Sequence, residues 1–534
     1  MSQRPGKVAV FEQFAADGLT TMFGNPGTVE QGFLDVLESV PDFGYVLALQ
    51  ETVAIAIADG FARAGARPAL VQLHSGVGLG NGIGMLYQAK RGHSPLVVVA
   101  GESGVRYDAM DAQMAADLVA MARPVTKYAT RVLDPSSVLR VLRRAVKLAM
   151  TPPRGPVFVA LPMDVLDALT SEAVVPTVIP NRTVTPQAAD IAQAVEILAA
   201  ANNPVILMGD GVSVSGAQRE LTVVAELLDA PVYGVDNSEH NMDPRHPLYR
   251  GNTGHMFGED SAARLSTVDA VLIVGTYVFP EVFPALGNPF PAGARIVHID
   301  LDDYEIAKNH PVDLAFVADP KPTLAALAEG LADAGRAQGV FELVPLPEVT
   351  EDSPLMAVFA AELNHQAGDD LIVVDEALTA SPHLTAHLPR RKPGTYFATR
   401  GGSLGIGIPG AIGAKIARPD AQVVGFTGDG GSMYTIQALW TAARHGVAAK
   451  FVICNNHRYQ LLDDNIDRYF EERDIAQHVH PSGFDLAEPE IGFVKLAEGL
   501  GVPAVRVDKP EQVPAAVQRM LSHDGPFLID LVTG

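Results

Sequence analysis

The amino-acid sequence predicts an α/β protein made of three doubly wound, parallel-sheet domains. Short apolar runs alternate with longer helical stretches along all 534 residues. These runs are continuously apolar, which is typical of parallel strands buried between two layers of helices. Two irregular, proline-containing segments divide the chain into three parts. At about 150 residues per domain, the length itself favours three or four domains.

Eleven apolar runs are predicted to be strands of these sheets. In chain order they are Tyr45–Leu49, Ala69–Leu73, Leu96–Ala100, Val157–Ala160, Val205–Met208, Ala270–Val274, Arg295–Ile299, Leu371–Val374, Val423–Phe426, Lys450–Cys454 and Phe527–Leu531. The alternation of strand and helix predicts βαβ units, in which helices cover both faces of each sheet.

Two segments with little periodicity are predicted to be linkers. Val174–Pro186 contains three prolines, and Phe341–Pro354 is similar and acidic. Dividing the chain there predicts domains over residues 1–175, 187–340 and 355–534, each of ordinary domain size.

Charge and composition exclude several classes of protein. The chain has 62 acidic against 39 basic residues, a formal charge of −23, which argues against nucleic acid or an anionic membrane as the main partner. The single cysteine, Cys454, excludes an intrachain disulfide framework and fits a reducing, cytoplasmic setting. Residues 1–7 lack the pattern of a signal peptide. The long uncharged stretch Pro68–Ala89 is too polar and glycine-rich for a membrane span.

The strongest chemical signal lies in the third predicted domain. The strand that ends near Thr427 leads into Gly428–Ser432, a helix is expected over Tyr434–His445, and the next strand ends at Asn455 and Asn456. Both motifs follow parallel strands, where α/β sheets bind ligands. Glycine backbones can approach a phosphate closely. The oxygens of Asp429 and Asn456, together with a backbone carbonyl and diphosphate, suit octahedral Mg²⁺.

An ordinary turn explains the same glycines, and the chain contains a second copy of the pattern. Gly209–Gly211 also has the sequence Gly-Asp-Gly after a predicted strand. Asn237 follows Asp210 at the same distance at which Asn456 follows Asp429. Spacing alone therefore does not decide which aspartate binds a metal.

Three further signals lie in the first predicted domain. Glu51 follows a strand and opens a helix, so it is either a buried carboxylate for proton transfer or a residue that stabilises the helix N-terminus. His74 ends a strand before a glycine-rich loop predicted over Ser75–Gly82, although a lone histidine is often structural. Thr28 ends the turn Asn25–Thr28 and could point into a cleft or cap a helix.

Taken together, these motifs resemble the thiamine diphosphate-dependent enzymes of the pyruvate decarboxylase and acetohydroxyacid synthase superfamily, with the benzoylformate decarboxylases most similar. The resemblance extends over essentially the whole chain and is carried by Phe23–Thr28, Leu47–Glu51, Leu73–Asn81, Arg400–Gly413 and Ala438–Gly446. It implies a first domain that binds the aminopyrimidine, a Rossmann-like middle domain and a third domain that binds the diphosphate. It also implies active sites between subunits, hence a homodimer at minimum and usually a homotetramer.

The resemblance implies a role for each matching residue. Glu51 matches the glutamate that hydrogen-bonds the aminopyrimidine, His74 a catalytic histidine, and Thr28 a hydroxyl that binds the substrate carboxylate. Leu404 matches the apolar residue that props the bent cofactor. Asp429, Asn456 and the carbonyl of Arg458 match the Mg²⁺ ligands. The remaining implied cofactor-binding residues are Asn25, Pro26, Gly402, Gly428, Gly430, Gly431, Ser432 and Tyr459.

The sequence departs from the benzoylformate decarboxylases at the substrate end. The stretch Val278–Phe283 lacks their second active-site histidine, and Val282 stands at the matching position. Leu378 replaces a hydroxyl that touches the diphosphate, Leu461 is bulkier than usual, and Gln113 replaces an apolar pocket residue. We therefore expect Gln113 and Leu461, together with Thr28, to line a pocket for small aliphatic substrates.

The expected activity is decarboxylation of a 2-oxo acid with thiamine diphosphate and Mg²⁺, accompanied by carboligase activity. An acetolactate synthase-like carboligase is the alternative within this class. A non-catalytic cofactor-binding or assembly protein is the alternative of another class, disfavoured because Glu51 and Asp429 are both present. A dinucleotide-binding dehydrogenase is disfavoured because the glycines of residues 76–80 are out of register for its fingerprint. A flavin would bind the middle domain, where the sequence gives no strong sign of one.

Overall fold

The computed structural model describes residues 3–181 and 183–534. It contains three six-stranded sheets, and the pairings described between their strands are parallel. By internal packing the chain forms two compact units. One holds the described residues up to 180 together with 349–388 and 399–534, and the other holds those of 181–348 together with 389–398.

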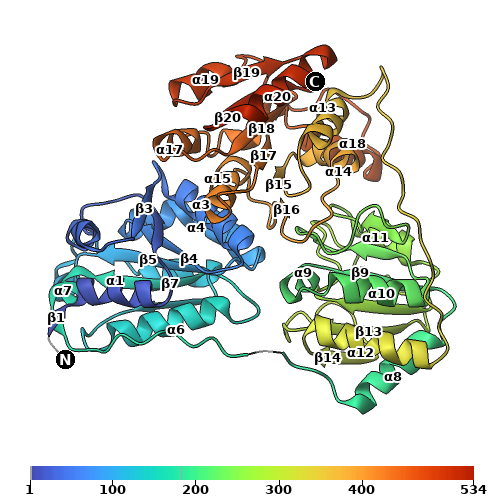
Figure 1. Ribbon diagram of the computed structural model, residues 1–534, viewed down its shortest axis with the longest axis horizontal. Coiled ribbons are helices and arrows are strands. Elements are labelled where there is room, and N and C mark those ends of the chain that lie inside the picture. Colours follow the sequence, from blue (N-terminus) through green and yellow to red (C-terminus); the bar gives the residue numbers. More distant parts are fainter. Residues whose placement is uncertain (1–2, 182) are drawn as a thin grey trace. The chain divides into compact units, whose positions relative to one another are not determined.

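The N-terminal sheet has the strand order β3-β2-β4-β5-β7-β6. Helices α1 and α6 cover one face and α3 and α4 the other (Figure 1). Its strands are β2 Thr21–Gly24, β3 Gly44–Leu47, β4 Ala69–Leu73, β5 Leu96–Glu102, β6 Tyr128–Arg131 and β7 Val157–Pro162, beside a short antiparallel pair, β1 Arg4–Pro5 and β8 Leu169–Thr170. Its helices are α1 Gly6–Ala16, α2 Gln31–Leu34, α3 Glu51–Gly65, α4 Ser75–Arg91, α5 Leu118–Ala122, α6 Val138–Met150 and α7 Met163–Asp167.

The central sheet has the order β11-β10-β9-β12-β13-β14. One face packs into a large apolar core with α8, α10 and α12, and the other forms a smaller core around Phe279 and Phe290. Its strands are β9 Pro204–Met208, β10 Val232–Gly234, β11 Tyr249–Asn252, β12 Ala270–Val274, β13 Arg295–Asp300 and β14 Leu314–Val317. Its helices are α8 Ala188–Ala199, α9 Gly211–Ser215, α10 Gln218–Leu228, α11 Gly258–Leu265 and α12 Pro320–Asp333.

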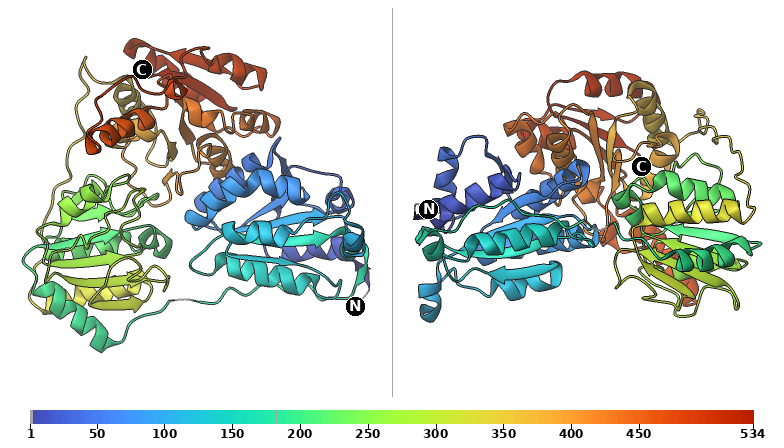
Figure 2. Two further views of the ribbon diagram at one scale, coloured as in Figure 1. Left: turned by 180° about the vertical axis from the view of Figure 1, so that it is seen from behind. Right: turned by 60° about the horizontal axis from the view of Figure 1, so that its bottom comes forward.

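The C-terminal sheet has the order β16-β15-β17-β18-β20-β19. Figure 2 shows its helices and strands from two further sides. The strands are β15 Ile372–Glu376, β16 Tyr396–Ala398, β17 Val423–Gly428, β18 Lys450–Asn455, β19 Ala504–Val507 and β20 Phe527–Val532. The helices are α13 Leu355–Gln366, α14 Ser381–His387, α15 Gly407–Ala417, α16 Asp429–Ser432, α17 Ala438–Arg444, α18 Gln460–Glu472, α19 Phe493–Gly499 and α20 Val513–Ser522.

The fold confirms the predicted class, and all eleven predicted strands are present with ends within two residues. Neither predicted linker contains a helix or strand among its described residues, and residue 182 lies outside them. The domain boundaries drawn through these segments stay a prediction. None of the described helices has both the length and the apolarity that a bilayer span requires.

Two expectations about local structure are wrong. The predicted glycine-rich loop over Ser75–Gly82 is the first half of helix α4. Its glycines serve close packing, because a Cβ at Gly82 would lie 2.4 Å from the Ile55 side chain of α3. The helix expected over Tyr434–His445 begins only at Ala438, after a series of turns.

Helices α3 and α15 join the N-terminal and C-terminal sheets through direct backbone contact. A Cβ at Gly60 would lie 2.1 Å from the Gly410 carbonyl oxygen, and one at Gly413 would lie 1.8 Å from the Ile57 carbonyl oxygen. Glycine is therefore needed on both helices for this approach. Helix α3 is buried almost all round, as expected for a helix covered by a sheet on one side and by another helix on the other.

A second contact between the N-terminal and C-terminal domains uses both the backbone N–H and the carbonyl of Leu47. The Leu47 N–H donates to Nε2 of His445 at 3.0 Å, and the Leu47 carbonyl accepts from the Thr441 hydroxyl at 3.1 Å. Thr441 and His445 lie four residues apart at the end of α17 and therefore share one side of it. This contact holds the end of β3, four residues before Glu51.

We predict that Gly413→Ala destabilises the protein by about 1–3 kcal/mol, because the new methyl group would force the two backbones apart. The measurement is the thermal unfolding midpoint. Gly84→Ala is the matched control: Gly84 is also inside a helix, but a Cβ there meets nothing within 4 Å. That change should be neutral or stabilise by about 0.5–1 kcal/mol. Equal midpoints for the two variants would contradict the packing argument.

Candidate active site

Asp429 and Asn456 lie at the same edge of the C-terminal sheet. Asp429 follows β17 and Asn456 follows β18, which pairs directly with it. The Asp429 side chain is buried, and one oxygen accepts the Gly430 N–H at 2.7 Å. The other oxygen, Oδ2, is buried without a hydrogen-bond partner. Burial raises the pKa of Asp429, although backbone N–H groups of residues 456–458 oppose the rise. An unpartnered buried carboxylate oxygen is costly, and a cation at this edge of the sheet would stabilise it.

The turn after Asn456 is held in a fixed shape. His457 has a left-handed backbone (φ 59°), and the Asn456 side-chain oxygen accepts the Arg458 N–H at 3.2 Å. Residues 484–486 pair with this turn through Tyr459 N–H to the Phe484 carbonyl and Leu486 N–H to the His457 carbonyl, both at 2.8 Å. The carbonyl of Arg458 is thereby fixed beside Asn456.

The second Gly-Asp-Gly copy has a different environment, which spacing could not reveal. Asp210 is also buried, but its carboxylate accepts backbone N–H groups of Ser238 and Glu239, the Ser238 hydroxyl and the Asn241 amide, at 2.5–3.1 Å. The Asn237 side-chain oxygen is bonded to Asn241. Both oxygens of Asp210 are therefore occupied by protein donors. Within the described chain no cluster of three His, Cys, Asp or Glu side chains could hold a metal, so Asp429 would bind one together with amide and carbonyl oxygens.

Open space and aromatic contact surround the glycines near Asp429. A Cβ at Gly402 or Gly428 would meet nothing within 4 Å, so a ligand can approach both backbones. The Tyr459 ring covers Gly430, where a Cβ would lie 2.3 Å from the ring. The Ser432 hydroxyl donates to the Asp429 carbonyl at 2.7 Å, which fixes this side chain against the start of α16.

Glu51 lies in a cage of amides in the N-terminal domain. It begins α3, its side chain is buried, and its two oxygens accept from Asn25 at 3.3 Å and Asn81 at 3.0 Å. The Glu51 carboxylate also lies against Gly78, where a Cβ would be 2.8 Å away. Gln50 caps the helix by accepting from Thr52 and Val53, so Glu51 is not the residue that caps it. Asn81 has a role here that the sequence did not identify.

His74 is held by a buried carboxylate that the sequence also did not identify. Its Nδ1 lies 2.8 Å from Glu30 Oε2, and the Gly101 N–H donates to the other Glu30 oxygen at 2.9 Å. Burial raises the pKa of Glu30, and His74 opposes that rise. Gly27 makes room for the imidazole, since a Cβ there would lie 1.9 Å from Nδ1. The ring therefore keeps one orientation.

The expected substrate residues lie on the surface near these groups. Thr28 is exposed in the turn before Glu30, with Pro26 also exposed. Gln113 is exposed in a segment that the Ser75 hydroxyl ties to the start of α4 through the Met114 carbonyl at 3.0 Å. Leu461 is half-buried in the first turn of α18, two residues after Tyr459, and Leu404 is half-buried ahead of α15.

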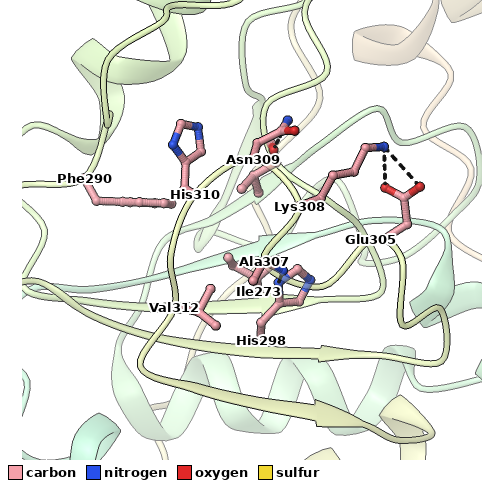
Figure 3. A pocket seen from close by; sticks show the side chains of 10 residues that line it. Ile273, Phe290, His298, Glu305, Ala307, Lys308, Asn309, His310 and Val312 are labelled. Carbon is pink, nitrogen blue, oxygen red and sulfur yellow. Dashed lines mark hydrogen bonds and ion pairs between the residues drawn. The ribbon is translucent and has the colours of Figure 1, made fainter.

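A separate pocket, too narrow to hold a water molecule, lies in the central domain (Figure 3). Its polar groups pair with one another or with the backbone. Nε2–H of His298 donates to the Thr276 carbonyl at 2.9 Å, burial lowers the pKa of that histidine to about 4, and Lys308 contacts Glu305 at 3.0 Å. Nothing in this pocket tests the flavin expectation.

Three family models match consecutive parts of the chain. They are the N-terminal TPP binding domain over residues 5–121, the central domain over 191–327 and the C-terminal TPP binding domain over 379–531, all of thiamine pyrophosphate enzymes. The chain therefore belongs to the thiamine pyrophosphate enzyme family, and the resemblance predicted from its motifs is confirmed.

Comparison with individual proteins indicates to which branch of this family the chain belongs. The chain is 33% identical to benzoylformate decarboxylase from Pseudomonas aeruginosa over 98% of each protein. It is 29% identical to a probable acetolactate synthase large subunit from Methanocaldococcus jannaschii, over 99% of this chain and 91% of the relative. The solved structure of the thiamine diphosphate-dependent 4-hydroxybenzoylformate decarboxylase from Rhodococcus jostii RHA1 matches with a TM-score of 0.89 at 31% identity, over 99% of each chain. This chain is thus an enzyme of the decarboxylase and acetolactate synthase branch.

Proposed function

We propose that the protein decarboxylates a 2-oxo acid with thiamine diphosphate and Mg²⁺, and that it also joins the product to a second carbonyl compound. The observation that carries this proposal is the unpartnered Asp429 oxygen beside open glycine backbones, in a chain that also holds Glu51 in an amide cage. The relatives support the reaction class, since their names include decarboxylases and acetolactate synthases.

The residues around Asp429 fit the cofactor's charged end. Asp429, Asn456 and the carbonyl of Arg458 would hold Mg²⁺ with hard oxygen donors. Backbone N–H groups of residues 428–432 would bind the diphosphate oxygens at the edge of the sheet. When bound, thiamine diphosphate supplies the electron sink that accepts negative charge as carbon dioxide leaves. The protein supplies position and protons.

Glu51 would exchange a proton with the aminopyrimidine ring. Asn25 and Asn81 donate to its two oxygens, which fixes the orientation of the carboxylate. Leu404 would support the bent cofactor from the other side. This arrangement uses proximity, since the groups that exchange protons are held ready before substrate arrives.

His74 would deliver or remove a proton at the substrate. Because Nδ1 faces Glu30, Nε2 is the nitrogen left for substrate. Glu30 is then a positioning residue that fixes the tautomer and the ring. The exposed Thr28 hydroxyl would bind the substrate carboxylate, and Gln113 and Leu461 would face the far end of the substrate.

A homodimer is the smallest assembly that would complete this site, and the family resemblance favours a homotetramer. Across residues 3–181 and 183–534, no hydrogen bond or ion pair links the Glu51 cage with the Asp429 edge. Apolar side chains beside both parts are exposed: Leu49 and Val77 near Glu51, and Tyr434 near Asp429. Pairing two chains would cover these side chains and bring the Glu51 of one chain to the diphosphate edge of its partner.

One observation favours an acetolactate synthase-like carboligase as a second candidate. Val282 is exposed at the position where the benzoylformate decarboxylases carry a histidine, so one proton donor is missing. Slower protonation of the substrate carbon from which carbon dioxide has left would give a second carbonyl compound more time to react with that carbon. A non-catalytic cofactor-binding or assembly role would show cofactor binding without turnover.

We predict appreciable 2-hydroxy ketone formation and a preference for small aliphatic 2-oxo acids, because Leu461 narrows the pocket and Gln113 offers a hydrogen bond. The holoenzyme is incubated with pyruvate and with benzoylformate in parallel, and carbon dioxide and products are measured by chromatography. Fast turnover of benzoylformate to benzaldehyde alone would contradict this pocket. Tight cofactor binding with no turnover of either acid would favour the non-catalytic alternative.

We also predict that Asp429→Ala folds normally but loses most of its affinity for thiamine diphosphate with Mg²⁺, because Asn456 and a carbonyl alone give a poor cation site. Calorimetry with both ligands measures this. The control, Asp210→Ala, removes an equally buried carboxylate that is bound only by protein donors. It should cost stability and leave cofactor affinity intact. Reversed results would assign the metal to Asp210.

For Glu51→Gln we predict retained cofactor binding and slower exchange of the thiazolium C2 proton, by roughly 10²–10⁴-fold, the usual range for a lost acid–base group. Exchange into deuterium oxide, quenched with acid and counted by NMR, measures this step without any substrate. Exchange at the wild-type rate would limit Glu51 to a structural role in α3.

A further inference from the structure

Glu376 is a buried carboxylate for which the reaction described above has no use. It is the last residue of β15, at the same edge of the sheet as Asp429, and its side chain is 1% exposed. Burial raises its pKa to about 7, against the effect of several hydrogen bonds donated to it. No sequence motif marks Glu376, because the predicted strand ends at Val374.

Its two oxygens bind the backbone on both sides of one short turn. The Gly405 N–H donates to Oε1, and the Gly407 N–H donates to Oε2 at 2.7 Å. These residues follow Leu404 directly, and Gly407 is the first residue of α15. The N-cap residue of α15, Ile406, offers no side-chain acceptor, so a carboxylate from β15 satisfies the free N–H groups of the helix.

The same side chain also contacts the phosphate side of the candidate site. The Thr427 side chain, at the end of β17, hydrogen-bonds Glu376, and a Cβ at Gly431 would lie 3.4 Å from Oε1. Gly405 has φ 96°, and its carbonyl accepts the Thr435 hydroxyl at 2.9 Å. The turn at Gly405 is therefore fixed by donors and acceptors on both sides, with Glu376 between the Leu404 turn and the residues 427–431.

We propose that Glu376 is a positioning residue that sets the conformation of the Leu404 turn and thereby the support beneath the bent cofactor. This inference rests on the proposed function for the role of Leu404, but the geometry of the turn does not depend on a cofactor. Glu376 is not a catalytic residue, because peptide N–H groups bind both oxygens and the side chain has almost no exposed surface.

The test compares Glu376→Gln with wild type by amide hydrogen exchange of the cofactor-free protein, read on peptides covering residues 400–408. Glutamine keeps the size but places an NH₂ group against a backbone N–H. We expect the amides of Gly405 and Gly407 to exchange about 10- to 100-fold faster, the effect of losing a buried hydrogen bond. Thiamine diphosphate with Mg²⁺ should bind about tenfold more weakly.

The control is Asp375→Asn, which changes the neighbouring buried carboxylate. Asp375 binds the Ala377 N–H at 2.9 Å and the Ser381 hydroxyl at 2.8 Å, and neither of these partners belongs to the Leu404 turn. In Asp375→Asn, the amide hydrogens of Gly405 and Gly407 should exchange at the wild-type rate. Unchanged exchange there in folded Glu376→Gln would overturn the proposal. If that variant does not fold, Glu376→Asp, which can reach only one of the two N–H groups, gives the same comparison. Wild-type protein that fails to bind the cofactor would contradict the proposed function and leave the exchange result standing.

Discussion

Helices α3 and α15 touch backbone to backbone, and the candidate site is built around that contact. Helix α3 begins at Glu51, and α15 begins three residues after Leu404. Because Gly60, Gly410 and Gly413 carry no side chains, the helices approach until carbonyl oxygens limit them. Their separation is therefore limited by van der Waals contact between backbone atoms rather than by flexible side chains. Small residues at such a crossing fix the angle and distance between two elements that carry functional groups at their ends.

Three buried carboxylates of this chain differ in which groups bind their oxygens. Asp210 is surrounded by protein donors, Glu376 binds two backbone N–H groups, and Asp429 keeps one oxygen without a partner. All three are desolvated to a similar degree. Since an unpaired buried carboxylate is costly, the one left incomplete is the one expected to bind a cation from outside the chain.

The sequence could predict the central strands because their apolar runs are continuous. Within the three large sheets it missed the edge strands β6, β11, β14, β16 and β19 and the interior strands β2 and β10, which have only three or four residues each. It missed the helix over Ser75–Gly82 because glycines favour loops unless close packing demands them. The motif residues around Glu51, His74 and Asp429 were predictable. Their partners Glu30, Asn81 and Glu376 were not, since each lies roughly 30–44 residues from the group it holds and no local pattern marks it.

The contact of Leu47 with Thr441 and His445 can form only late in the synthesis of the chain. His445 and Leu47 are 398 residues apart. A ribosome adds about 5–20 residues per second, so Leu47 is synthesised roughly 20–80 s before its partner His445. During that interval α3, which is apolar almost all round, has no α15 to cover it. The nascent first domain therefore exposes an apolar face of α3 to other chains until synthesis is nearly finished. The separation of these two segments in the sequence therefore sets how long that face of α3 is open to contacts with other chains.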